Sequence, residues 1–253
     1  MTTLVVGASG ATGRLLVEQL LARGQKVKAI VRSRDSLPLA LSKDSHLTII
    51  EASILDLSDT ELVEYVSGCD AIASCLGHNL TFQGLFGQPR RLVTDATRRL
   101  CEAIKANKSE TKVKFVLMNT TGNRNGDLEE PISFAQKCVI GLLHLLLPPH
   151  VDNEEAADYL RTQIGQIDQA IAWAAVRPDG LIDEDEVTEY EVLPSPIRSA
   201  IFDSGKTSRI NVADFMADLI VDRNIWNEWK GQMPVIYNQD YYNVTPIPVT
   251  QAD

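Results

Sequence analysis

Short apolar runs alternate with helix-like segments along the first 180 residues of the chain. The runs are typical of strands buried on both faces of a sheet, and six are predicted, at 3–6, 26–32, 47–50, 71–73, 113–118 and 170–176. Apolar residues recur at helical spacing at 14–23, 62–66 and 92–106, the second of these opened by a capping box at 58–61. This order predicts right-handed crossovers and a parallel sheet covered by helices on both faces.

The pattern becomes less regular after Pro178. Residues 179–207 contain an acidic stretch at 183–186 and two prolines, and we expect an irregular cap on the substrate side of the sheet. A helix at 212–223 and a strand at 234–237 should follow. Because the chain has no internal repeat and no long flexible linker, we expect residues 1–253 to form a single α/β domain with a doubly wound parallel sheet.

A glycine-rich loop, Gly7-Ala8-Ser9-Gly10-Ala11-Thr12-Gly13, follows the first predicted strand and opens a helix. Its spacing is G-x-x-G-x-x-G, but its place between a buried strand and a helix is the one in which a dinucleotide pyrophosphate binds. Gly7 should make a tight turn, Gly10 should leave room for phosphates, and Gly13 should let the helix pack closely. A Rossmann-type NAD(P)-binding fold is predicted; the alternative is a turn without a ligand. The predicted phosphate-binding residues are Gly7, Ser9, Gly10, Ala11, Thr12 and Gly13.

Arginines follow the second predicted strand, where NAD-selective domains carry an acidic residue. That acid lies about 20 residues past the loop and accepts hydrogen bonds from the adenosine 2′-hydroxyl. Here no acid occurs before Asp35, and Arg32 would offer a planar set of donors to a 2′-phosphate, with Ser33 and Arg34 beside it. We therefore expect NADP(H) to be favoured over NAD(H); the alternative is an ordinary exposed arginine.

Residues 4–16 resemble the start of the atypical short-chain dehydrogenases/reductases. Within them, the chain is most similar to the NAD(P)H-binding group that includes NmrA-like proteins and biliverdin/flavin reductases. Further stretches at 54–57, 176–181 and 207–213 resemble segments of the same family in the same order, so the resemblance spans nearly the whole chain. It implies that Asp56 lies near the adenine of the cofactor.

Candidate catalytic residues follow the fourth and fifth strands, because open α/β sheets bind ligands at the carboxyl ends of their strands. His78 is a candidate proton donor, and a solvated loop histidine is the alternative. The resemblance implies a serine or threonine after the fifth strand that binds a substrate carbonyl; the alternative is a threonine that satisfies a turn. The residues concerned are Cys75, Leu76 and Gly77 as cofactor contacts and His78, Thr120 and Thr121 as catalytic candidates.

The proton-donating pair usual in the family, Y-x-x-x-K, is absent from this sequence. In the similar segment at 150–161, the position usually held by lysine or histidine is Asn153, whose amide can hold a nicotinamide ribose hydroxyl but cannot act as a general acid. This favours hydride transfer to a flavin or quinone, since the proton can then come from water. A non-catalytic NADP(H) sensor of NmrA type and an epimerase or dehydratase are the alternatives.

Composition and charge argue against several other classes of protein. The net charge of −10 leaves no basic surplus for nucleic-acid binding, and four scattered cysteines predict reduced thiols in a cytoplasmic protein without a metal site. No signal peptide opens the chain, and no apolar run reaches the ~20 residues of a membrane span. The longest run, 139–147, is expected to be a buried helix or the face of a homodimer, or else a lid over the nicotinamide side. The expected partner is a small-molecule substrate.

Overall fold

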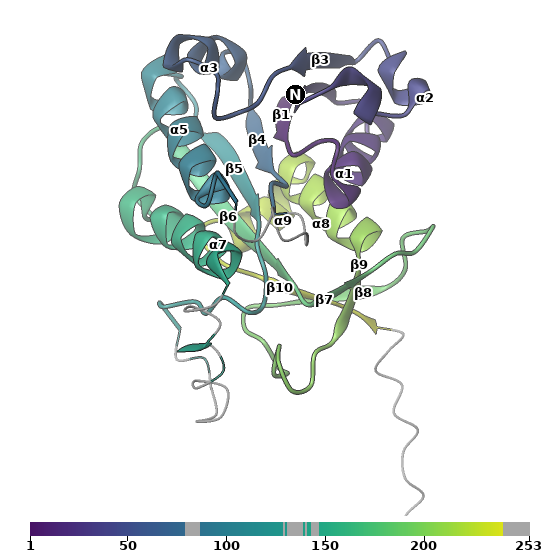
Figure 1. Ribbon diagram of the computed structural model, residues 1–253, viewed down its shortest axis with the longest axis vertical. Helices are drawn as coiled ribbons and strands as arrows, with labels where there is room; N and C mark the ends of the chain where they lie inside the picture. Colours follow the sequence, from purple (N-terminus) through teal and green to yellow (C-terminus); the bar gives the residue numbers. More distant parts are fainter. Residues whose placement is uncertain (79–86, 129, 131–138, 140, 143–146, 240–253) are drawn as a thin grey trace, which may run out of the picture.

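An eight-stranded sheet runs through the computed structural model, which describes residues 1–78, 87–128, 130, 139, 141–142 and 147–239 (Figure 1). The strand order is β3-β2-β1-β4-β5-β6-β10-β8, and every neighbouring pair is parallel except β10 and β8. This confirms the predicted doubly wound sheet. The strands are β1 (Thr2–Val6), β2 (Lys26–Val31), β3 (Leu47–Glu51), β4 (Ala71–Ser74), β5 (Val113–Met118), β6 (Ile171–Pro178), β8 (Tyr190–Leu193) and β10 (Val235–Asn238).

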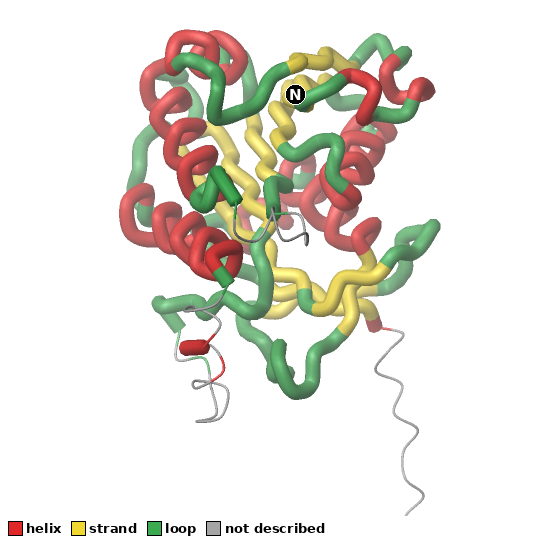
Figure 2. Tube along the Cα trace, viewed as in Figure 1, coloured by secondary structure: helices red, strands yellow, loops and turns green. Residues whose placement is uncertain are grey.

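Helices cover both faces of the sheet, as Figures 1 and 2 show. The predicted capping box is present at the start of α3, where Ser58 and Glu61 exchange side-chain and backbone hydrogen bonds. Smaller helical elements, η1 (Arg34–Ser36), α2 (Leu39–Ser42) and η2 (Leu160–Ile164), lie between the larger ones. One face carries α3 (Asp59–Val66), α5 (Leu92–Asn107) and α7 (Pro148–Tyr159); the other carries α1 (Ala11–Ala22), α8 (Arg209–Val221) and α9 (Arg223–Trp229).

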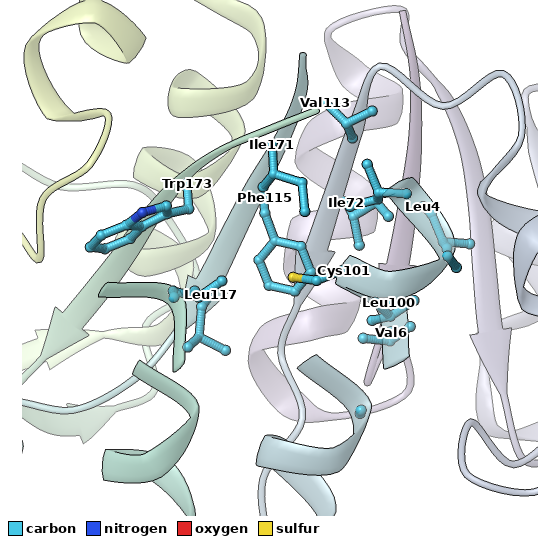
Figure 3. Packing of buried hydrophobic residues seen from close by; sticks show 14 of the residues in the cluster. Leu4, Val6, Ile72, Leu100, Cys101, Val113, Phe115, Leu117, Ile171 and Trp173 are labelled. Carbon is cyan, nitrogen blue, oxygen red and sulfur yellow. The ribbon is translucent and has the colours of Figure 1, made fainter. Parts of the chain in front are cut away.

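Successive residues of each central strand enter two different cores. In β1, Leu4 and Val6 pack on the side of α5, while Val5 packs on the side of α1 and α8. Figure 3 shows the first of these cores, in which the almost fully buried rings of Phe115 and Trp173 lie on adjacent strands. Burial on both faces explains why these strands are continuous apolar runs in the sequence.

Residues 179–207 are more regular than the sequence predicts. Strands β7 (Gly180–Ile182) and β9 (Lys206–Ser208) form a small parallel sheet, and β8 extends the edge of the main sheet. Strands of three or four residues are too short to produce a readable periodicity. The helix expected from 212 begins at Arg209, because Ser208 caps it by accepting a hydrogen bond from the Asn211 amide.

The apolar segment 139–147 lies mostly outside the described residues. Within the part of the chain that the structure describes, no helix combines the length and apolar character needed to cross a membrane.

A buried ion pair ties the sheet to the loops beyond its carboxyl edge. Arg177, at the end of β6, pairs with Glu130 through two hydrogen bonds of 2.7 and 3.1 Å, and both side chains are almost fully buried. Its guanidinium also donates to the backbone carbonyls of Asn123, Met233 and Pro194. Buried charges are tolerated only when they are paired and hydrogen-bonded in this way, so removal of one partner is costly.

Arg177→Met should therefore lower the free energy of unfolding by about 3–5 kcal/mol, since it leaves the Glu130 charge buried and unpaired. Chemical denaturation measures this loss. Arg209→Met is the control, because Arg209 pairs with the exposed Asp183 at 2.8 Å, and a surface pair contributes at most about 1 kcal/mol. Similar losses in the two variants would contradict the role given to the buried pair.

Candidate functional site

A cavity of about 540 Å³ lies at the carboxyl ends of β1 to β4. The strand order reverses at β1, which has β2 on one side and β4 on the other, and open α/β sheets bind ligands at such a point. Segments that end or follow all four strands line this cavity, together with residues that precede α5. The lining residues fall at 6–7, 9–10, 30–32, 52–55, 75–78, 87–89 and 92.

Two glycines of the loop are required by the backbone itself. Gly7 has φ +73°, and a Cβ added there would lie 2.5 Å from the carbonyl oxygen of Cys75. A Cβ on Gly13 would lie 2.1 Å from the carbonyl oxygen of Gly7, so α1 can approach the loop only because this residue has no side chain. The tight turn and the close helix packing expected of these two residues are both present.

Gly10 differs from these two glycines. Its φ is −71°, a Cβ added there would meet only the Gly7 carbonyl oxygen at 3.2 Å, and the residue lines the cavity. It is also the N-cap of α1, and no side chain among the described residues caps the helix there. The unpaired N–H groups and the positive end of the helix dipole therefore favour an anion at this place.

The predicted phosphate-binding residues divide into two groups. Gly7, Ser9 and Gly10 line the cavity, whereas Ala11, Thr12 and Gly13 form the first turn of α1. The second group can contribute backbone N–H groups. Thr12 and Gly13 are buried, however, and neither residue lines the cavity.

Arg32 is the predicted cofactor residue that adds positive charge to the cavity. It is exposed and lines the opening, and among the described residues no acidic side chain pairs with it. Ser33 and Arg34 are outside the lining. Arg34 instead donates to the Ile49 carbonyl at 3.1 Å and lies 3.8 Å from the carboxylate of Glu51.

The segment after β3 lines the cavity, but not through Asp56. Asp56 is exposed and outside the lining, which here is formed by residues 52–55. Arg99 of α5 holds this segment, since its guanidinium donates to the carbonyl of Leu55 at 2.9 Å and also to that of Leu57. The sequence pattern gave no sign of this long-range contact.

All four residues predicted after β4, Cys75, Leu76, Gly77 and His78, line the cavity. Burial raises the pKa of the Cys75 thiol to about 12, so the thiol is neutral at physiological pH and a poor nucleophile.

His78 is paired with a carboxylate that sequence reasoning missed. Its Nε2 lies 2.7 Å from Oδ2 of Asp152 on α7, and their side chains are only 6% and 1% exposed. The carboxylate also accepts hydrogen bonds from the Val93 and Thr94 amides at the start of α5. Burial by itself would raise the pKa of Asp152, but the hydrogen bonds from His78, Thr94 and Val93 outweigh it and lower that pKa.

The residues predicted after β5 are outside the cavity lining and make contacts within the protein. Thr120 Oγ1 accepts a hydrogen bond from the Gly122 amide at 3.2 Å, which matches the alternative of a threonine that satisfies a turn. Thr121 Oγ1 donates to Asp179 at 3.0 Å; burial raises the pKa of Asp179 despite the hydrogen bonds that it accepts. Catalytic roles for the two threonines remain predictions.

Asn153 is likewise outside the lining. Its side-chain amide donates to the carbonyl of Pro149 at 3.0 Å, one turn earlier in α7, and its own carbonyl accepts a hydrogen bond from Asn119 at 2.9 Å. Contact with a nicotinamide ribose would require this side chain to change its partner.

Residues 7–223 match the model of a family described as NAD(P)H-binding. Because the match covers more than half of the chain, the protein belongs to this NAD(P)H-binding family. This confirms the NAD(P)H-binding group that the sequence resembles.

The chain is also similar to a curated protein in sequence and to solved proteins in structure. An uncharacterized chloroplastic protein of Arabidopsis thaliana is 37% identical over 71 residues, which are 28% of this chain and only 25% of that relative. A putative NADH-flavin reductase of Streptococcus pneumoniae has a similar structure, with a TM-score of 0.62 and 19% identity over 94% of this chain and 100% of that one. ChuY, an anaerobillin reductase of Escherichia coli O157:H7, gives a TM-score of 0.65 and 20% identity over 95% and 98% of the two chains. At these identities the structural neighbours show a shared fold.

Replacement of Gly10 and of Gly13 by valine should separate binding from folding. Gly10→Val should lose nucleotide binding in calorimetry because its side chain enters the cavity, while stability falls by about 1 kcal/mol through the poorer N-cap. Gly13→Val should lose more than about 3 kcal/mol of stability, beyond the usual cost of overpacking, because the clash is with backbone. Unchanged nucleotide affinity in Gly10→Val would exclude the loop as the binding site.

Proposed function

We propose that the protein is an NADPH-dependent reductase of small planar electron acceptors such as a flavin or a quinone. One observation carries the proposal: the cavity at the switch point of the sheet joins the uncapped N-terminus of α1 to the cationic side chain of Arg32. This combination supports the proposal, since it would offer separate places for the pyrophosphate and the 2′-phosphate of the same nucleotide.

The lining of the cavity fits the rest of the cofactor. Apolar side chains of Ile30, Ile54 and Leu55 can pack against an adenine ring, and the residues after β4 continue the wall from the loop toward His78. When bound, the reduced nicotinamide supplies the hydride. The protein's own contribution is to bind and orient the nucleotide and to exclude water from the reacting centre.

The choice of acceptor follows from the groups that could supply a proton. The Y-x-x-x-K pair that serves ketone reduction in similar proteins is absent, and His78 is the predicted acid that lines the cavity. A flavin or quinone forms a stabilised anion after hydride transfer, so it depends less on a strong acid than a ketone does. The names of two structural neighbours, a putative flavin reductase and an anaerobillin reductase, support acceptors of this planar kind.

The proposal is tested by anaerobic NADPH oxidation with a panel of flavins, quinones and aldehydes. We expect steady turnover with at least one planar acceptor and little with aldehydes. Gly10→Val is the matched control, because it should remove nucleotide binding while the fold is kept. Tight NADPH binding without turnover on any acceptor would refute the reductase.

That outcome would support the second candidate, a non-catalytic sensor that binds NADP(H) and passes its redox state to a partner. The observation in its favour is that Thr120, Thr121 and Asn153 all have side-chain hydrogen bonds within the protein. A catalytic side chain must be able to form a hydrogen bond with the substrate, and these three side chains already form theirs within the protein.

Arg32→Ala should weaken NADPH binding and leave NADH binding almost unchanged, because only NADPH has a 2′-phosphate. A charge-assisted hydrogen bond contributes roughly 1.5–3 kcal/mol, which corresponds to about 10- to 100-fold in Kd. Arg34→Ala is the control, since Arg34 is already held by Ile49 and Glu51. Calorimetric titration with both nucleotides measures the effect. An equal loss of affinity for NADH and NADPH would mean that Arg32 does not bind the 2′-phosphate.

A further inference from the structure

We propose that Arg99, a residue of α5 outside the cavity lining, is a positioning residue for the cofactor: its guanidinium fixes the wall against which the adenine ring binds. The inference rests on the nucleotide site proposed above and adds to it a residue that the nucleotide would not touch. It concerns the adenosine half of the nucleotide, and neither the nicotinamide half nor hydride transfer.

The guanidinium of Arg99 holds three backbone carbonyls of one segment. Its Nη1 donates to the carbonyl of Leu55 at 2.9 Å and to that of Ile54 at 3.3 Å, and its Nη2 donates to the carbonyl of Leu57. The segment 52–57 joins β3 to α3 and is neither strand nor helix. Because the N–H groups of a guanidinium form a rigid planar fork, they fix the peptide groups that they bond relative to one another.

Two of these carbonyls belong to residues of the cavity wall. Ile54 and Leu55 line the cavity, whereas Arg99 does not. The side chain of Ile54 also packs in the core that α5 covers, so apolar contact holds this side chain while Arg99 holds its peptide group. Arg99 therefore shapes the wall without contacting a molecule that binds against it.

The same wall adjoins Arg32, the residue proposed to bind the 2′-phosphate. The Ala52 amide donates to the Val31 carbonyl at 2.8 Å, so the segment that Arg99 holds begins against the residue that precedes Arg32. Residues on both sides of this hydrogen bond line the cavity. Adenine and the 2′-phosphate are parts of one adenosine, and this corner of the cavity could hold them together.

The backbone contacts of Arg99, and not its ion pair, carry the proposed role. Arg99 lies 2.9 Å from Oδ1 of Asp59, but the Asp59 side chain is 90% exposed and that of Arg99 only 16%. A pair with one partner in solvent is screened and contributes little. Hydrogen bonds from a charged donor to the carbonyls are stronger, and they order the wall before a ligand arrives, which lowers the entropic cost of binding.

Arg99→Met tests the proposal, since methionine keeps an unbranched apolar side chain but has no N–H group to donate. In calorimetry we expect the Kd to rise about tenfold, or 1.4 kcal/mol, the size of one net hydrogen bond. The factor should be the same for NADPH, for NADH and for 2′,5′-ADP, because all three contain adenine. This separates Arg99 from Arg32, whose replacement should weaken NADPH binding and leave NADH binding almost unchanged.

Hydrogen exchange gives a second readout, which needs neither ligand nor turnover. In free Arg99→Met, the amides of the segment 52–57 should exchange faster than in the unaltered protein, while those of the central strands keep their rates. Saturation with NADPH should restore part of the protection. A residue that only stabilised the fold would instead speed exchange throughout the sheet.

Arg98→Met is the matched control, because Arg98 is the neighbouring arginine of α5, is about half exposed and lies 3.8 Å from Asp95. It should leave both the Kd and the exchange rates unchanged. Asp59→Asn removes the exposed partner of Arg99 but keeps the backbone contacts, so the Kd should stay within about twofold. Arg99→Lys keeps the charge without the planar fork and should give an intermediate loss of affinity.

Several results would overturn the proposal. Unchanged affinity in Arg99→Met would do so, as would equal losses in Arg99→Met and Arg98→Met, or a loss for NADPH without one for 2′,5′-ADP. If the methionine variant does not fold, Arg99→Lys decides, and an unchanged Kd in that variant contradicts the role. Failure of the unaltered protein to bind NADPH would refute the nucleotide site itself, whereas tight binding that is independent of Arg99 would refute only this inference.

Discussion

The site depends on a contact between backbones that leaves no room for side chains. Gly7 lies against the carbonyl of Cys75, and Gly13 lies against the carbonyl of Gly7, so the ends of β1 and β4 and the first turn of α1 are packed together without a Cβ between them. This packing brings the uncapped N-terminus of α1 to the switch point of the sheet. The place of the proposed phosphate site therefore follows from the two glycines, and the space within it follows from a third, Gly10.

The rest of the cavity wall is held by polar contacts over long distances in the sequence. Arg99 of α5 holds the segment after β3 by its carbonyl groups, and Asp152 of α7 holds both His78 and the first turn of α5. Outside the cavity wall, Arg177 and Glu130 hold the segments after β5 and β8 in the same way. In each case a charged side chain is buried or half-buried and makes several of its hydrogen bonds with backbone groups. Such contacts fix the loops that a ligand would meet.

The sheet and the glycine loop could be predicted because their signals are local. Strands buried on both faces, such as β1 and β5, must be continuous apolar runs, and a tight turn with a following close-packed helix requires Gly7 and Gly13. The contacts of Arg34 and Asp152 could not be predicted, since each joins elements far apart in the sequence. Residues 179–207 were expected to be irregular because their strands are too short to show alternation. Thr120 was singled out by position alone, and its hydroxyl is already bonded within a turn.

A crystal structure of the protein with NADPH tests the central claim most directly, because it locates both phosphate groups at once. We expect the pyrophosphate at the N-terminus of α1 beside Ser9 and Gly10, and the 2′-phosphate within hydrogen-bonding distance of the Arg32 guanidinium. A nucleotide bound outside this cavity, or one in the cavity with its 2′-phosphate turned away from Arg32 into solvent, would contradict the site and the cofactor preference proposed for this protein.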